Sequence, residues 1–126
     1  MKKYNIKKAT YNISYRNADG VMEARPVSGY IFSYCGVRFG LSRCHGFNKD
    51  LSPVVLSSWC VTELYTGLSL GRPYEKYTLN ETIRNLNENY YKIESLVKAT
   101  IERYIANGGN DMNPDQDAEN ELTLTA

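Results

Sequence analysis

Apolar and polar residues alternate along the first part of the chain, which is the pattern of a strand with one buried face. Residues 9–16 show it most regularly, and residues 17–20 (Asn-Ala-Asp-Gly) have the composition of a turn. Residues 21–25 then form the returning strand of a hairpin. It is expected to end at Pro26, which cannot donate a hydrogen bond to a neighbouring strand, or to lie at an edge. This stretch predicts a first hairpin. Its inward positions are Ala9, Tyr11, Ile13 and Tyr15.

A second group of short apolar segments follows, separated by glycine-containing turns. Gly36 can adopt the positive φ that a tight hairpin turn requires. The segments are residues 30–34, 37–41, 54–65 and 68–70. Together with the first hairpin they predict an antiparallel β-meander of five or six strands across residues 4–71. The polar stretch 43–53 is expected to be a loop.

The pattern changes to a helical period after residue 77. Thr78 and Glu81 form a capping box, in which two side chains satisfy backbone donors of the first turn. Asn107 and the glycines that follow are typical of a helix end. One long helix is therefore predicted over residues 78–107, and the fold class is α+β: the meander, one long C-terminal helix and a tail.

The apolar positions of this helix repeat with a mean spacing of about 3.5 residues, as in a coiled coil. At about 1.5 Å per residue the helix would be about 43 Å long, longer than a small sheet can cover. The expectation is a homo-oligomer that forms through the helix. The alternative is that the chain's own sheet covers the whole stripe. The interface positions are Leu79, Ile83, Leu86, Tyr90, Ile93, Val97, Ile101 and Tyr104.

Length and composition indicate one domain in a reducing compartment. A chain of 126 residues is large enough for a single core. It has no apolar run of membrane-spanning length and only three cysteines, an odd number. These features predict a cytoplasmic protein that makes no membrane contact, with one α+β domain over residues 1–110.

Charge is unevenly distributed along the chain. Residues 1–49 hold nine basic and two acidic side chains, a net charge of +7, whereas residues 111–126 hold five acids and no base. The Asn, Asp, Gly and Pro content of that last segment predicts a disordered acidic tail over 111–126. A basic first half suits an anionic small molecule, a nucleic acid or an acidic host protein. It is equally typical of a solvated edge strand that resists aggregation.

No residue pattern indicates catalysis. Cys35, Cys44, His45 and Cys60 are spaced unlike zinc knuckles, and neighbouring residues such as Cys44 and His45 point apart in extended chain. Whether these four side chains meet is left open. The acids of the tail do not match a calcium-binding loop. No metal, cofactor or enzymatic activity is therefore expected.

Tyrosine and arginine supply the candidate ligand residues. Eleven tyrosines interleave with arginines in the sheet half, an arrangement that can stack bases and bind phosphates. Tyrosines are equally typical of cross-strand pairs, Trp59 of a core, and Arg72 of a plain surface. The candidate ligand-binding residues are Arg38, Arg43, Trp59 and Arg72.

One segment resembles a known group of proteins. Residues 59–68 (Trp-Cys-Val-Thr-Glu-Leu-Tyr-Thr-Gly-Leu) resemble the W-x-V-T-x-x-x-T-G-L segment of small uncharacterised α+β proteins of phages and mobile elements. Some phage proteins of this layout, such as the anti-Thoeris group, assemble through helices and sequester cyclic nucleotide signals. The resemblance implies a phage or mobile-element accessory protein of anti-defence type, and it assigns no functional residue.

The resulting functional expectation is a non-catalytic protein that sequesters a phosphate-bearing ligand such as a nucleotide signal. Two other classes stay open: an inhibitor that binds a host protein directly, and a nucleic-acid-binding protein.

Overall fold

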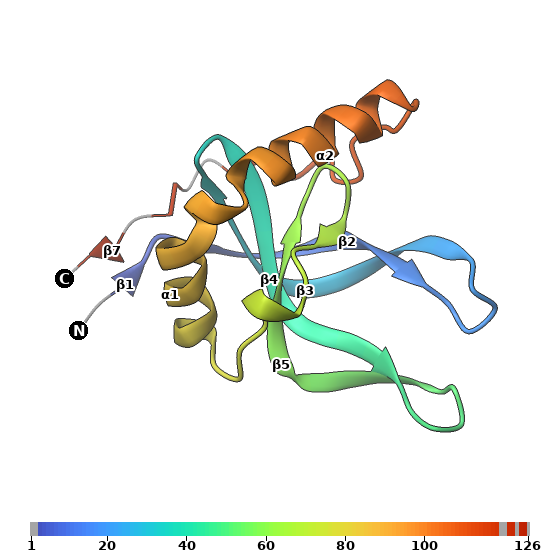
Figure 1. Cartoon of the computed structure of the whole chain (residues 1–126). Coiled ribbons are helices and arrows are strands. Elements are labelled where there is room, and N and C mark those ends of the chain that lie inside the picture. Colours follow the sequence, from blue (N-terminus) through green and yellow to red (C-terminus); the bar gives the residue numbers. More distant parts are fainter. Residues whose placement is uncertain (1–2, 119–120, 123, 126) are drawn as a thin grey trace.

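A computed structural model of the chain describes residues 3–118, 121–122 and 124–125. Its main sheet is antiparallel, with the strand order β2-β3-β4-β5-β6 (Figure 1). A separate two-stranded sheet pairs β1 with β7 near the two chain ends. The strands are β1 Lys3–Tyr4, β2 Lys7–Arg16, β3 Met22–Tyr34, β4 Val37–Phe47, β5 Pro53–Glu63, β6 Leu68–Ser69 and β7 Leu124–Thr125. The helical elements are η1 Arg72–Tyr74, α1 Leu79–Asn89, η2 Tyr90–Lys92 and α2 Glu94–Ala106. The α+β class and the antiparallel meander are confirmed.

The sheet curls until its first strand meets the turn before its last strand. Ser14 in β2 donates its backbone N–H to the carbonyl of Gly67 at 2.8 Å. Gly67 has a φ of 73°, and a Cβ there would lie 2.8 Å from the Ser14 nitrogen, so only glycine fits. Across the curled interior, the Tyr11 ring covers Gly40 in β4. The result is a partly closed barrel, from which the β2–β3 and β4–β5 hairpins project as two arms (Figure 1).

Strand alternation gives the curled sheet two cores, one on each face. The inner face holds one cluster, and the outer face packs against the helices. On the inner face the main side chains are Tyr11, Ile13, Tyr15, Val27, Ile31 and Leu64. On the outer face they are Phe32, Val37, Phe39, Leu41 and Val61, together with Ile83, Leu86 and Tyr90 from the helices.

The prediction of one long helix is wrong, although its start is right. Thr78 caps α1 by accepting the N–H of Glu81 at 3.1 Å. The helix then breaks at η2, where the N–H of Ile93 bonds to the Tyr90 carbonyl at 2.9 Å, three residues back. This break buries the Tyr90 ring against Phe39. It also turns α2 so that it crosses the sheet in a different direction from α1 (Figure 1).

Half of the apolar seam is buried on the chain's own core, and the oligomer through the helices stays a prediction. Four of its residues, Ile83, Leu86, Tyr90 and Val97, are buried in the outer core, and Leu79, Ile93 and Ile101 pack against that core. Tyr104 meets Tyr65 edge to face, with ring centroids 6.0 Å apart. The break at η2 explains why the overhang expected of a straight helix is missing, because each half follows its own part of the sheet.

The expectation of a disordered tail is also wrong for the described part of residues 111–126. Asn113 is only 2% exposed, and Ala118 and Leu122 are buried. The Asn113 amide accepts from the Asn12 N–H at 2.6 Å and donates to the carbonyls of Asn12 and Leu64 at 3.0 and 2.7 Å. One side chain thereby joins β2 to the end of β5, and the segment closes the barrel beside the Ser14–Gly67 bond. Residues 119, 120, 123 and 126 lie outside the described part.

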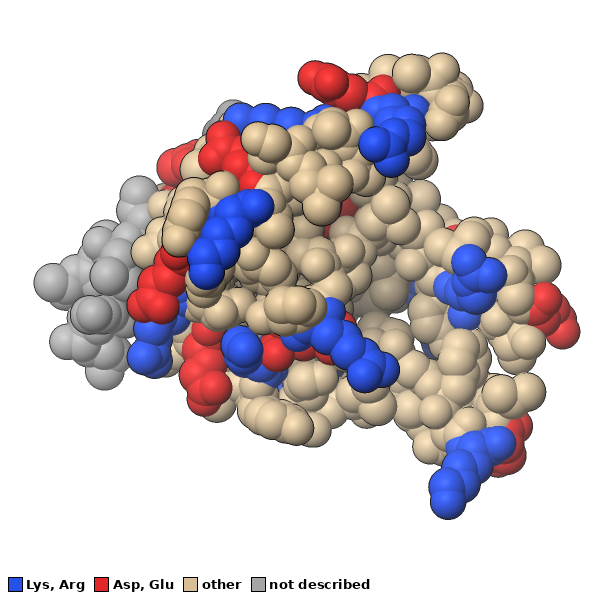
Figure 2. All heavy atoms as spheres, in the orientation of Figure 1, with Lys and Arg blue, Asp and Glu red and all other residues tan. Residues whose placement is uncertain are grey.

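Basic side chains of the described chain are dispersed on the face seen in Figure 2. They lie along the helices and out on the two arms, with acidic side chains between them. The excess of positive charge in residues 1–49 therefore does not become one concentrated patch on this face. No helix in the described part of the chain is long and apolar enough to cross a membrane.

Candidate functional site

The structure separates the four predicted ligand residues. Arg38 and Arg43 lie an odd number of positions apart on β4, which puts them on opposite faces of the sheet. The Arg38 guanidinium binds both carboxylate oxygens of Asp111 at 2.8 Å. It also donates to the carbonyls of Asn113 and Gln116, at 2.8 and 2.7 Å. Arg38 thus holds the C-terminal segment, and its donors are already used.

Arg43 and Trp59 are brought together on the outer face. They are direct partners on β4 and β5, and the guanidinium carbon lies 4.5 Å from the Trp59 ring centroid. Arg43 also donates to the Ser57 carbonyl, and Tyr30 packs beside Trp59 at a centroid distance of 6.2 Å. Arg72 does not belong to this pair and is exposed on η1. This group is a stacked cation–π pair with one free edge, not an enclosed site.

A half-open cavity lies instead on the inner face, at the mouth of the barrel between the two arms. This cavity of about 300 Å³, the hairpin pocket, is formed by β2, β4, β5, β6 and the residue after η1. Its inner wall carries Cys44, Cys60 and Thr62, and its rim carries Arg16, His45, Phe47 and Glu75. The remaining lining residues are Ile13, Ser14, Tyr15, Gly46, Gly67 and Ser69.

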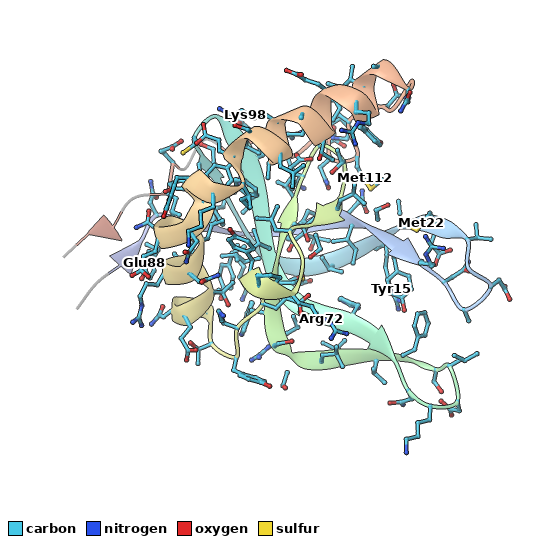
Figure 3. All side chains as sticks on the ribbon, viewed as in Figure 1. Tyr15, Met22, Arg72, Glu88, Lys98 and Met112 are labelled. Carbon is cyan, nitrogen blue, oxygen red and sulfur yellow. The ribbon has the colours of Figure 1, made fainter. Side chains whose placement is uncertain are left out.

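Tyr15 is the central aromatic residue of the hairpin pocket. Its ring lies 5.6 Å from that of Phe47 and 6.3 Å from that of His45, so it spans the gap between the arms. The Arg25 guanidinium covers the ring at 4.4 Å. The Tyr15 hydroxyl is buried and meets no hydrogen-bond partner among the described residues. Figure 3 shows Tyr15 in the opening between the two hairpins, with Arg72 at its edge in this view.

A second cleft adjoins the hairpin pocket, on the side of Tyr15 that lies toward the tips of the two arms. It has a volume of about 540 Å³ and shares Tyr15 and Phe47 with the pocket. Arg25 and Glu23 supply charge on its β3 side, and Leu51 supplies an apolar surface from the β4–β5 arm. Both cavities therefore border the aromatic pair, with the Arg25 guanidinium over one face of the Tyr15 ring.

The ionisable groups of the hairpin pocket are tuned by their surroundings. Burial, and secondarily the charge of Arg25, lowers the pKa of His45, which keeps the imidazole neutral. A hydrogen bond from Cys60 lowers the pKa of Cys44. Glu75 provides a carboxylate at the pocket wall, opposite in charge to Arg16. The pocket thus combines aromatic surface, hydrogen-bond acceptors and one rim arginine.

The four Cys and His residues left open by the sequence are only partly brought together. Cys44, His45 and Cys60 line the same pocket, whereas Cys35 lies in the turn at the other end of β4. Within the part of the chain that the structure describes, no three His, Cys, Asp or Glu side chains are arranged to hold a metal ion.

Sequence reasoning missed the hairpin pocket, although part of the signal was present. Alternation placed Ile13 and Tyr15 on the buried face of β2, as observed. The contacts with Phe47 and His45 depend on the curl of the sheet, which alternation does not encode. The stretch 43–53, expected to be a loop, instead contributes the end of β4 and the tip of an arm.

Searches against protein-family models, curated proteins and solved structures found no match to this chain.

Proposed function

We propose that the protein is a non-catalytic binding protein that sequesters a small phosphate-bearing ligand, such as a nucleotide signal, in the hairpin pocket. The observation that carries the proposal is the Tyr15–Phe47 pair, an aromatic surface that borders both cavities. A planar base can stack on such a surface, and stacking is worth about 1–3 kcal/mol per base.

The polar groups around this aromatic pair match the rest of a nucleotide. Glu75 lines the pocket and can accept hydrogen bonds from a base amine. Arg16 stands at the rim, where a guanidinium suits a phosphate. The proposed site contains none of the four ligand residues predicted from the sequence, which are Arg38, Arg43, Trp59 and Arg72. The role of a phage or mobile-element accessory protein rests on the resemblance of residues 59–68.

Isothermal titration against mono-, di- and cyclic nucleotides tests this proposal. At least one class is expected to release heat, and Arg16→Gln and Glu75→Gln are each expected to weaken its binding about tenfold or more. Arg84→Gln serves as the matched control, because Arg84 is exposed on α1 and takes no part in the hairpin pocket. The absence of heat from every nucleotide, or an equal loss in the control, would refute the proposal.

Direct binding to a host protein is the second candidate, and the arm tips favour it. Val21 and Met22 on one arm are 59% and 46% exposed, and Leu51 and Val55 on the other are 60% and 64% exposed. Exposed apolar side chains on two projecting hairpins are typical of a protein contact surface. Capture of one host protein that depends on these four residues, and does not respond to nucleotide, would favour this alternative.

A further inference from the structure

Cys44 and Cys60 lie on the inner face of two neighbouring strands, at the base of the hairpin pocket. Cys60 is the direct partner of Ser42, and its sulfur lies 3.9 Å from the Ser42 hydroxyl oxygen. Cys44 follows Ser42 by two positions and therefore shares its face. The pairing register shifts between Arg43 and His45, so this part of the β4–β5 ladder is irregular. Two thiols thus face one cavity from strands that are already paired.

The two thiols interact with each other and differ in character. Hydrogen bonding to Cys60, and to a smaller extent to Ser58, favours the Cys44 thiolate and lowers the pKa of Cys44. The same contact, together with burial, raises the pKa of Cys60. Cys35 in the β3–β4 turn is exposed, but partial desolvation and the charges of Glu94 and Glu121 raise its pKa.

Access distinguishes these thiols from ordinary core cysteines. Cys44 and Cys60 are only 5% and 8% exposed, but both line the hairpin pocket. A small oxidant can enter a cavity of about 300 Å³, whereas bulky thiol reagents meet the Tyr15 and Phe47 rings at the rim. The geometry favours a reaction with a small reagent over one with a large reagent.

We infer that Cys44 and Cys60 form a dithiol site for oxidation by hydrogen peroxide, in which Cys44 is oxidised first and Cys60 then closes an intramolecular disulfide. The two cysteines share the hairpin pocket with the proposed nucleotide site, but the inference does not depend on nucleotide binding.

The chemistry proceeds in two steps. The Cys44 thiolate attacks one peroxide oxygen, the O–O bond breaks, and the departing hydroxide takes a proton to become water, which leaves Cys44 as a sulfenic acid. Cys60 then loses its proton, its sulfur attacks the Cys44 sulfur, the S–O bond breaks, and the oxygen leaves as a second water. In total the two sulfurs lose two electrons, the peroxide gains them, and one disulfide forms.

The order of the steps follows from the contact between the thiols. While Cys44 is a thiolate, its charge keeps the proton on Cys60. Once Cys44 is a neutral sulfenic acid, that cause disappears and Cys60 can ionise. Cys44 and Cys60 are diagonal neighbours on paired strands, a position in which Cα atoms are about 7–8 Å apart, so closing a disulfide requires a small movement of the backbone. The irregular register provides the local adjustment needed for closure.

The test uses the whole folded chain, treated with hydrogen peroxide and digested with trypsin after the free thiols have been blocked. Cleavage after Arg43, Lys49 and Lys76 places Cys44 in residues 44–49 and Cys60 in residues 50–76, because Pro73 prevents cleavage after Arg72. The expected product is these two peptides joined by a disulfide, with a mass loss of about 2 Da in the intact chain. Cys35 falls in a separate peptide that ends at Arg38, so it is counted independently.

Variants establish the roles of the two cysteines. In a C35S background, Cys60→Ser is expected to stop at a sulfenic acid on Cys44 that dimedone traps, whereas Cys44→Ser is expected to leave Cys60 unmodified. Retention of both thiols by the unsubstituted chain would overturn the inference, and so would oxidation confined to Cys35. Because the peptide map needs no substitution, the inference stays testable if a serine variant fails to fold.

Discussion

Replacing Asn113 by alanine should destabilise the chain far more than its place in a polar terminal segment suggests. The change removes three hydrogen bonds, to the N–H and carbonyl of Asn12 and to the carbonyl of Leu64. It leaves these backbone groups of two strands without their partner at a position that is only 2% exposed. At about 1 kcal/mol for each bond, the expected loss is about 3 kcal/mol. For a domain whose total stability is about 5–15 kcal/mol, this is a large fraction.

Urea unfolding followed by the fluorescence of Trp59 measures this loss. Asn110→Ala is the matched control: Asn110 is exposed in the same segment, and its backbone carbonyl, not its side chain, accepts the Tyr104 hydroxyl. The control is expected to change stability by less than about 0.5 kcal/mol. Amide hydrogen exchange at Asn12 should accelerate in Asn113→Ala and not in the control. Equal stability of the two variants would refute the closure of the barrel by Asn113 and support a disordered tail.

Three further changes test other parts of the fold. Gly40→Ala should cost about 1–3 kcal/mol in urea unfolding, because the new methyl group would overlap the Tyr11 ring. Arg38→Gln should lower the free energy of unfolding by about 2 kcal/mol. Asp111→Asn should lower it less, because Arg38 keeps its two carbonyl acceptors in that variant. A larger loss in Asp111→Asn would contradict this reasoning. His45 has a lowered pKa in the folded chain, so the unfolded chain binds its proton more readily below about pH 6.5. Stability should therefore fall between pH 7.5 and 5.5, and His45→Gln should reduce that slope.

Local signals in the sequence predicted the elements of the fold well. Alternation in residues 9–16 located β2 and its buried face, and Gly36 marked the β3–β4 turn, where its φ is 78°. Thr78 located the start of α1. Each of these features is decided within a few residues by backbone conformation or by a capping side chain, which is why one sequence suffices to predict them.

The break between the helices was not predictable from the seam. Its apolar spacing continues in phase through residues 89–93, and no proline or glycine interrupts it. The structure shows why a break is nonetheless favoured: Tyr90 gains a buried site against Phe39 and Tyr34, with ring centroids 5.6 and 5.3 Å apart. That gain depends on the curvature of a sheet formed by distant residues. Tertiary packing overrode the local period.

The tail and the hairpin pocket were missed for a related reason. Asn113 bonds to Asn12, 101 positions away, and Gln116 donates to the Thr10 carbonyl, 106 positions away. A polar segment rich in Asn and Asp has the composition of a disordered chain, because composition records how little apolar surface it can bury. It does not record that a curled sheet offers unpaired backbone groups that one amide can satisfy.

Part of the positive charge that suggested an anion-binding surface is used within the chain. Arg38, one of the basic residues that suggested such a surface, spends its donors on Asp111 and on two carbonyls of the segment that closes the barrel. Part of the anionic partner expected from the charge distribution is thus the chain's own C-terminal segment. The hairpin pocket, where the arms hold Tyr15 against Phe47 above the two thiols, adjoins this closure, because Ser14 and Gly67 line it. The segment that closes the barrel therefore also supports one wall of the pocket in which we propose binding and thiol chemistry.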